Sequence, residues 1–342
     1  MRVVSARQLN RAMLARQLLL ERADLAIEDA LDRVGGLQTQ YAPSGYVGLW
    51  SRIAGFSRAD LTSALEARTV AQGTLLRATI HLVSAGEYWR YAAGIRAARR
   101  AWSLRVGTGM DEAALFVAAA ALRERLLAGP RYVKDLGDAA DGFPGHVGAW
   151  LDLVRVPPSG TWERRRADRL GLAETWLCPR DASEEEGLAH LVRAYLRAFG
   201  PAPWKAISTW AGVGVGELRR AGASVDLVRY ADEAGRELLD LAGTPLPDPD
   251  IPAPVRFLPH WDALLLVHAR RTGVLPEEHR ARVFNTRQPF SVGTVLVDGR
   301  VAAGWSLRDG VVVVDPFRPL SSTERDSVEE ERAGLQGFLA RP

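Results

Sequence analysis

The sequence predicts an α+β protein with three tandem winged-helix units followed by a small C-terminal β-rich module. Three observations support this prediction. A helix-turn-helix pattern recurs along the chain, a proline-rich connector interrupts it after residue 244, and two Asp-Gly turns follow between runs of β-branched residues. Helix, turn, helix and then a β-hairpin is the order of elements in a winged helix.

An internal repeat defines the second and third units. The repeated stretches are LRERLLAGPRYVKDL (122–136) and VRAYLRAFGPAPWKAI (192–207), and in each a helical pattern stops at a Gly-Pro pair before the next helix begins. A strand-turn-strand signal follows each stretch, with its turn at 157–160 in the first copy and at 232–235 in the second. We therefore place the second unit at residues 106–183 and the third at 184–248.

The first unit, residues 1–105, follows the same plan more loosely. Helical patterns cover residues 6–21, 26–34 and 58–66. The stretch 70–89 is typical of a hairpin-like pair of strands that runs into a helix.

A change of character after the third unit marks the C-terminal module, residues 255–342. Five prolines between residues 245 and 254 predict a rigid connector. Beyond it, Asp298-Gly299 and Asp309-Gly310 each separate runs of β-branched residues, which is the strongest short-range hairpin signal. A helix over 322–339 closes the chain, with Ser322 or Thr323 expected as its N-cap.

Composition excludes several classes of protein. The chain has 342 residues, of which 47% are hydrophobic and 25% charged, as in ordinary globular proteins. No apolar run resembles a signal peptide or a membrane span, so we expect a cytoplasmic, nucleoid-associated protein without a membrane partner. A single cysteine excludes a disulfide framework, and six scattered histidines lack metal-ligand spacing. We therefore expect no metal and no cofactor.

Positive charge is clustered along the chain. The net charge is only +3, but RAARRAWSLR (96–105) and WERRRADR (162–169) concentrate arginines beside aromatic residues. Such clusters are the electrostatic footprint of a protein that binds a polyanion. Solvated helix faces remain the alternative interpretation of either cluster.

Two glutamines form the candidate catalytic motif. Gly35 and Gly36 are expected to end the preceding helix, and if LQTQ is then extended, Gln38 and Gln40 point to the same side. Two neutral amides can hold a water molecule but cannot act as strong bases. They suit the hydrolysis of an N-glycosidic bond whose base already carries a positive charge, as in an N7-alkylated purine. A polar pair at a helix-to-loop junction is the alternative.

Three stretches together resemble a known family. GLQTQYAPSGYVGLWSRI, TLLRATIHLVSAGEY and VLVDGRVAAGW are similar to segments of the AlkZ/YcaQ family of winged-helix DNA glycosylases. The resemblance implies three winged helices and a β-module that form a concave basic surface for duplex DNA. It implies excision of N-alkylated purines, including bulky natural-product adducts and interstrand crosslinks. The Gln-x-Gln motif is that of the AlkZ-like branch, which is often tied to self-resistance in bacteria that make DNA-alkylating antibiotics.

The resemblance also suggests residues that contact DNA. The family's Arg-x-Thr-Leu-His element looks like residues 77–81, and its Asp-x-Leu-Leu-Leu-x-His segment looks like residues 262–268. Two departures are Thr39, where an apolar residue is more usual, and Arg270, where relatives commonly have an acid. Together with the basic cluster at 162–169 and the Asp298-Gly299 turn, these matches give the predicted DNA-binding residues: Arg77, Thr79, His81, Arg164, Arg165, Arg166, His268, Arg270, Arg271 and Arg300.

The sequence therefore predicts a monofunctional DNA glycosylase, with Gln38 and Gln40 as its catalytic residues. We expect it to act as a monomer on double-stranded DNA that carries alkylated purines. No lysine lies near the glutamines, which argues against Schiff-base lyase chemistry. The alternatives are a non-catalytic winged-helix regulator or adduct-sequestering protein, and a scaffold that does not bind nucleic acid. The sequence leaves open which lesion is removed.

Overall fold

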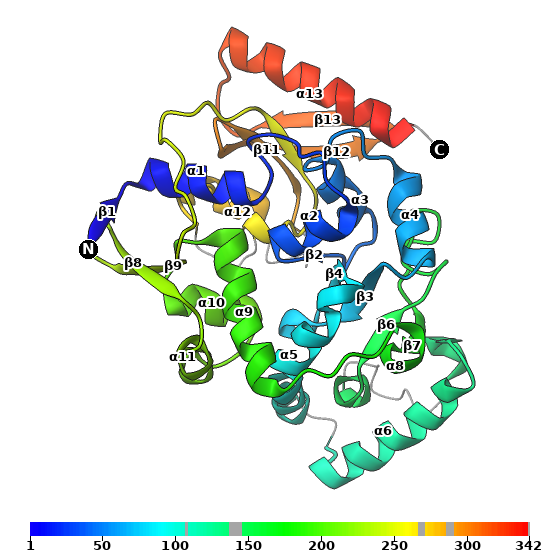
Figure 1. Ribbon diagram of the computed structural model, residues 1–342. Helices are drawn as coiled ribbons and strands as arrows, with labels where there is room; N and C mark the ends of the chain where they lie inside the picture. The colour runs from blue at the N-terminus through cyan, green and yellow to red at the C-terminus, as the bar shows by residue number, and fades with distance from the viewer. Residues whose placement is uncertain (107–108, 137–145, 266–270, 285–290, 341–342) are drawn as a thin grey trace.

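The computed structural model describes residues 1–106, 109–136, 146–265, 271–284 and 291–340 (Figure 1). Within these residues the chain is a mixed α+β protein whose strands form three sheets. No helix in the described ranges is long and apolar enough to cross a bilayer.

The N-terminal part contains the glutamine motif. Its elements are β1 (Arg2–Val4), α1 (Ala6–Arg16), α2 (Ile27–Val34), β2 (Leu37–Gln38), α3 (Pro43–Trp50), α4 (Arg58–Glu66), β3 (Val70–Thr74), β4 (Ile80–Ser84) and α5 (Ala85–Val106). The strand pair and helix predicted over 70–89 are confirmed as β3, β4 and the start of α5. The helix predicted over 6–21 is too long, because α1 ends at Arg16 and Leu18 turns the chain with a φ of 56°.

The next segment extends the same sheet. It comprises α6 (Glu112–Leu127), β5 (Arg131–Tyr132), β6 (Leu153–Arg155), β7 (Arg169–Leu172) and α8 (Ala173–Trp176). The hairpin predicted around 157–160 is confirmed, because β6 and β7 pair antiparallel. β6 also pairs with β3, which gives a six-stranded sheet in the order β2-β4-β3-β6-β7-β5. The first two predicted units therefore share one continuous sheet.

The segment after α8 is mainly helical and lies at the centre of the molecule (Figure 1). Its elements are α9 (Glu184–Phe199), α10 (Trp204–Ala211), α11 (Val215–Gly222), β8 (Leu227–Asp232) and β9 (Glu237–Leu241). Helix α9 packs on α1, α2, α5, α10 and α11 (Figure 1). Its Gly187 crosses α5 at Gly94, where an added Cβ would lie 2.2 Å from the Gly94 nitrogen, so only glycine allows this approach. The predicted β8–β9 hairpin is confirmed, and β1 extends it as a parallel strand.

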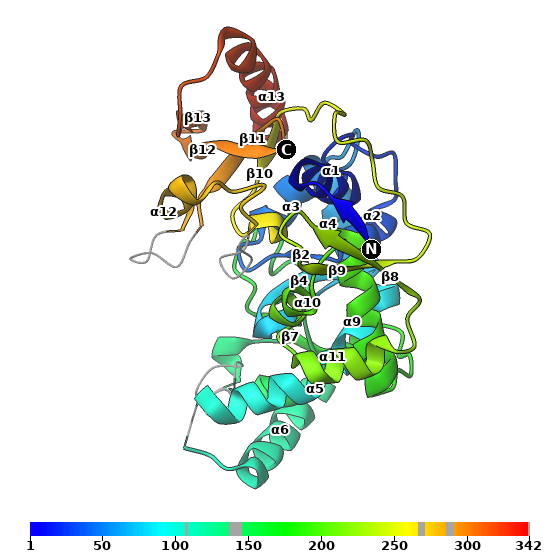
Figure 2. The same cartoon turned by 90° about the vertical axis from the view of Figure 1, so that its left-hand side faces the viewer.

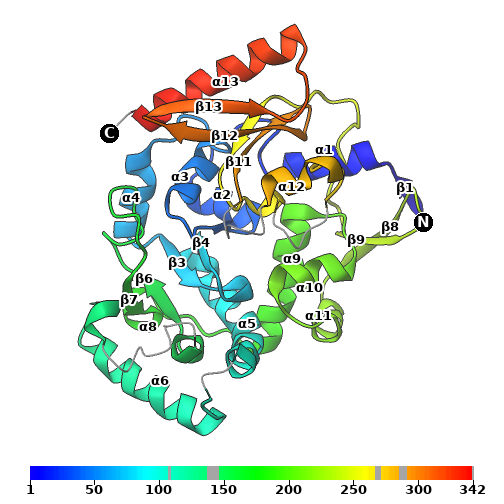
Figure 3. The ribbon, with the colours of Figure 1, turned by 180° about the vertical axis from the view of Figure 1, so that it is seen from behind.

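The C-terminal module is a four-stranded antiparallel sheet with a long helix beside it. Its elements are β10 (Arg256–Leu258), α12 (Arg280–Val283), β11 (Gly293–Val297), β12 (Arg300–Arg308), β13 (Val311–Pro316) and α13 (Ser322–Ala340). Figures 2 and 3 show α13 along this sheet, at the end of the molecule opposite α6. Both Asp-Gly hairpins are confirmed. The N-cap prediction was off by one residue: Ser321 accepts the Glu324 N–H at 3.2 Å, and the Glu324 carboxylate accepts the Ser321 N–H.

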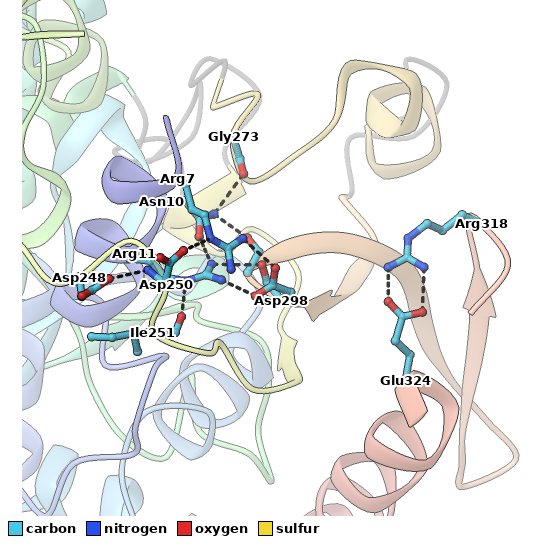
Figure 4. A network of polar contacts seen from close by, with 11 residues as sticks. Arg7, Asn10, Arg11, Asp248, Asp250, Ile251, Gly273, Asp298, Arg318 and Glu324 are labelled. Atoms are coloured by element: carbon cyan, nitrogen blue, oxygen red, sulfur yellow. Dashed lines mark hydrogen bonds and ion pairs between the residues drawn. The ribbon is translucent and has the colours of Figure 1, made fainter. Parts of the chain in front are cut away.

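The Asp298-Gly299 turn is anchored to α1 (Figure 4). The carboxylate of Asp298 accepts hydrogen bonds from the buried guanidinium of Arg11 and, at 3.1 Å, from Nη1 of Arg7. The side-chain amide of Asn10 donates to the Gly299 carbonyl at 2.8 Å. These contacts fix the C-terminal sheet against the N-terminal helix.

Candidate active site

Two consecutive glycines place the glutamine motif on an edge strand. Gly35 ends α2 in the left-handed conformation, with a φ of 77°, and Gly36 follows at 76°. The chain then pairs with β4, so that Leu37 faces Leu82 and Gln38 faces His81. The predicted helix stop at the two glycines is confirmed. The predicted extended conformation of LQTQ is confirmed for Leu37 and Gln38, which form β2. The glycines redirect the chain from α2 onto the edge of the sheet.

Thr39 is directed away from the glutamines. Its side chain is fully buried, and a Cβ added to Gly45 in α3 would lie 2.8 Å from Thr39 Cγ2. Its backbone N–H donates to the Ile80 carbonyl at 2.8 Å, which continues the pairing with β4. Because side chains alternate along an extended chain, Gln38 and Gln40 are turned away from this core.

The two amides are held by the same neighbouring segment. Oε1 of Gln38 accepts a hydrogen bond from Nη2 of Arg77 at 3.3 Å, and Oε1 of Gln40 accepts from the Ile80 N–H at 3.2 Å. Gln38 is 9% exposed, whereas Gln40 is exposed to solvent. Each amide oxygen has a second lone pair, so a water molecule can still donate to it. The site thus combines one sheltered and one exposed amide.

Arg77 connects the motif to α10. It lies in a turn with left-handed backbone at both Arg77 and Ala78, whose φ angles are 53° and 57°. Its guanidinium donates to the Trp210 carbonyl as well as to Gln38. Burial lowers the pKa of Arg77 to about 10, and the positive charge of Arg271 adds to the shift. Arg77 stays protonated at neutral pH and orients the Gln38 amide.

Thr79 and His81 form a local pair beside Gln38. Thr79 Oγ1 donates to the Leu76 carbonyl at 3.0 Å, and Nδ1 of His81 lies 3.1 Å from the Thr79 carbonyl oxygen. His81 is only 3% exposed and stands between Gln38 and Gly73 on the neighbouring strands. These contacts favour a supporting role under the motif, and DNA contact by either residue stays a prediction.

Comparison with known proteins identifies the family of the chain. The model of the family described as "DNA glycosylase AlkZ-like" matches residues 31–338, which is most of the sequence and includes both glutamines. The chain belongs to the AlkZ-like DNA glycosylase family.

A solved structure has the same fold as this AlkZ-like protein. This chain is similar to the solved structure of Streptomyces sahachiroi DNA glycosylase AlkZ, with a TM-score of 0.82 over 98% of this chain and 97% of that one. The two sequences are 20% identical, so this likeness concerns the fold. None of the curated protein sequences compared with the chain gives a significant match.

Arg164, Arg165 and Arg166, three of the four arginines in the basic cluster at 162–169, contact other residues in this AlkZ-like protein. They lie in the loop between β6 and β7, residues 156–168. Arg164 donates to the Tyr132 hydroxyl at 2.9 Å, and Arg165 donates to the Tyr41 hydroxyl at 3.2 Å. Arg166 pairs with Asp168 at 3.0 Å and keeps 87% of its side chain exposed. All three arginines are exposed to solvent, and Arg166 is the one that pairs with a carboxylate.

The remaining residues predicted to contact DNA in this AlkZ-like protein differ in their exposure and in their contacts within the protein. Arg271 donates to the Ala263 and Leu264 carbonyls at 2.6 and 2.9 Å, and its guanidinium lies 4.3 Å from the centre of the Phe199 ring. Arg300 is exposed at the start of β12. His268 and Arg270 lie outside the described residues.

Sequence reasoning missed two aromatic residues near the motif. Tyr41 directly follows Gln40, and its ring meets that of His260 edge-to-face with centroids 5.9 Å apart. The position of Tyr41 in the quoted motif was a usable signal, but nothing local indicated that His260 would come beside it. No cluster of potential metal ligands occurs among the residues that the structure describes. A cavity of about 540 Å³ between α1, α9 and α10 includes neither glutamine.

Proposed function

We propose that this protein is a monofunctional DNA glycosylase that hydrolyses the N-glycosidic bond of N7-alkylated purines in duplex DNA. The observation that supports this best is the pair Gln38, at the end of edge strand β2, and Gln40, two residues beyond it, held by Arg77 and the Ile80 N–H. Family membership supports a DNA substrate. Repair of alkylated DNA or self-resistance to an alkylating natural product, with crosslinks included, is the biological role that we propose.

The chemistry follows from the charge of the lesion. Alkylation at N7 makes the purine cationic, so the base leaves with the electrons of its glycosidic bond and becomes neutral without first gaining a proton. The sugar develops oxocarbenium character, which the oxygen ends of two fixed amide dipoles stabilise. A water molecule that donates to those oxygens attacks C1′ and releases its proton to solvent. No strong base is needed.

In this proposal the rest of the chain binds the DNA. We assign three winged-helix units to residues 1–105, 106–183 and 184–248, followed by the β-rich module of residues 255–342. The predicted arginines contact phosphates, and one protomer is sufficient. Lys134 follows β5 and Lys205 lies on α10, so neither belongs to the glutamine motif. This placement agrees with hydrolysis without a Schiff base.

A release assay tests the proposal. Wild type is expected to release N7-methylguanine from duplex DNA, and the Gln38→Ala/Gln40→Ala double variant is expected to lose at least about a hundredfold in rate, as when a preorganised donor or acceptor is removed. Duplex binding by the double variant should be unchanged.

Gln336→Ala is a matched control for the loss of an amide. Gln336 also accepts a backbone N–H, that of Val312 at 2.8 Å, but it lies on α13. This variant should release the base at the wild-type rate. Tight binding without release of methyl or bulky adducts by wild type would contradict the glycosylase and favour a regulator or sequestering protein.

A further inference from the structure

Tyr41 is the side chain at which three parts of the molecule meet. It follows Gln40 directly, and it is partly exposed. Arg165 from the loop between β6 and β7 donates to its hydroxyl at 3.2 Å. His260, two residues after β10, meets its ring edge-to-face. Residues 124 and 219 positions further along the chain thus contact the residue beside the motif.

The loop that provides Arg165 is rigidly built. Ser159 Oγ accepts the Asp168 and Arg169 N–H groups at 2.7 and 3.0 Å and donates to the Arg166 carbonyl at 2.7 Å. These bonds close residues 159–169 on themselves. The loop therefore presents Arg165 from a fixed base.

Trp162 attaches this loop to the N-terminal and C-terminal parts. Its ring packs on Tyr46 of α3 and on Phe338 of α13, with centroid distances of 5.6 and 6.3 Å. The guanidinium groups of Arg58 and Arg165 lie 4.7 and 5.3 Å from its centre. The orientation of Arg165 is consequently tied to both ends of the chain.

His260 is oriented on its other side. Its Nδ1 lies within hydrogen-bond distance of the Ser291 carbonyl oxygen, which fixes the plane of the imidazole. An edge-to-face contact between two rings covers at most one face of the Tyr41 ring. Tyr41 is held by its hydroxyl and by one ring contact while it remains partly open to solvent.

We propose that the ring of Tyr41 is a stacking surface for the target purine and that Arg165 is the positioning residue that orients this ring. The proposal rests on the proposed function, because it concerns the base that the glutamines act on. An N7-alkylated purine is a planar cation, and the electron-rich face of tyrosine attracts such a ring more strongly than a neutral purine. Tyr41 would thus contribute to the choice of lesion.

The test measures lesion preference in binding, separately from catalysis. Anisotropy gives the dissociation constants for a duplex with one N7-methylguanine and for the same unmodified duplex. All variants are made in the Gln38→Ala/Gln40→Ala background so that the lesion stays intact. Stacking of a base on an aromatic ring contributes measurably to affinity, and its loss on alanine substitution weakens binding. Tyr41→Ala should therefore reduce the preference for the lesion about tenfold, with little change on plain DNA.

Tyr132→Ala is the matched control. Tyr132 accepts the same kind of hydrogen bond from the neighbouring Arg164 of the same loop, at 2.9 Å, but lies on β5. This variant should keep the full preference. An unchanged preference in Tyr41→Ala, or an equal loss in both variants, would overturn the proposal.

A double-mutant cycle tests the role of Arg165. Arg165→Gln should lower the lesion preference a few-fold when Tyr41 is present but not in the Tyr41→Phe background, because the hydroxyl that it orients is then absent. An equal effect in both backgrounds would show that Arg165 does not act through Tyr41. If wild type binds the lesion preferentially but releases no base, the glycosylase proposal fails while the stacking surface stands.

Discussion

At the scale of single residues, the glutamine pair depends on groups that its own motif does not contain. Gln38 is oriented by Arg77, and Arg77 is in turn fixed by the Trp210 carbonyl of α10. Gln40 is oriented by a backbone N–H of β4. A neutral amide has no charge to select its partner, so its direction comes from such fixed neighbours.

Thr39 gives a prediction at this scale. Its Oγ1 is buried and finds no hydrogen-bond partner among the described residues. Thr39→Val keeps the shape and removes the unsatisfied hydroxyl, so the free energy of unfolding should rise by about 1 kcal/mol. Base release should be unchanged because the side chain faces away from the glutamines. Urea unfolding and the release assay check both expectations, and a lower release rate would show that Thr39 contributes to the site.

The sequence alone could predict the backbone of the motif but not the environment of its side chains. Gly35 and Gly36 predicted the end of the helix because only glycine readily adopts the left-handed conformation found at both positions. The contacts of Arg77 with Trp210 and of Arg165 with Tyr41 join residues 133 and 124 positions apart. Such pairs depend on tertiary packing, for which no local pattern exists.

At the scale of elements, the predictions that succeeded depended on residue types that readily adopt a positive φ. Asp298-Gly299 and Asp309-Gly310 have positive φ at both positions, as a two-residue hairpin turn requires. The prediction for the first helix failed because its end has no glycine or proline. Leu18 takes the left-handed conformation there, and a leucine gives no warning of it.

Gly36 gives the prediction at the scale of elements. An alanine there would hold its Cβ 2.9 Å from Val83 Cγ1 and 3.0 Å from the Leu82 carbonyl oxygen, at a φ of 76°. Gly36→Ala should lower the free energy of unfolding by about 3 kcal/mol, because left-handed strain and crowding add. Base release should also fall, since β2 must move away from β4.

Gly55→Ala is the control for the strain alone. Gly55 has a φ of 68°, and a Cβ there would meet no atom of the described residues within 4 Å. It should lower the free energy of unfolding by about 1 kcal/mol and leave base release unchanged. Equal losses of stability in the two variants, measured by urea unfolding, would show that crowding against β4 is unimportant.

At the scale of the whole molecule, strand pairing joins segments that the sequence pattern separates. β1 at the N-terminus pairs with β8, and β3 pairs with β6 across the boundary expected near residue 105. Repeats and connectors could predict the order of the units. They could not predict these pairings, because strands choose their partners by packing of the complete fold rather than by nearby sequence.

A buried ion pair also joins the N-terminal part, which holds the glutamine motif, to the C-terminal module. Arg52, just after α3, and Asp262, just after β10, are fully buried and lie 3.0 Å apart. Arg52 also donates to the Gly48 carbonyl at 3.0 Å and to Gln17 Oε1 at 3.2 Å. Removal of one partner leaves the other charge buried, which is far more harmful than the loss of an exposed pair.

Asp262→Ala should therefore lower the free energy of unfolding by about 3–5 kcal/mol. Asp315→Ala breaks the exposed pair between Arg282, whose side chain is 43% exposed, and Asp315, whose side chain is 67% exposed. This variant should lower the free energy of unfolding by less than about 1 kcal/mol. Urea unfolding followed by fluorescence measures both. A single transition in Asp262→Ala would mean that the C-terminal module unfolds with the glutamine site, whereas two transitions would mean that this pair is what makes them cooperative. If Asp262→Ala lowered the free energy of unfolding by less than about 1 kcal/mol, the Arg52 charge would have found water or another partner. The ion pair would then not be what joins the N-terminal part to the C-terminal module.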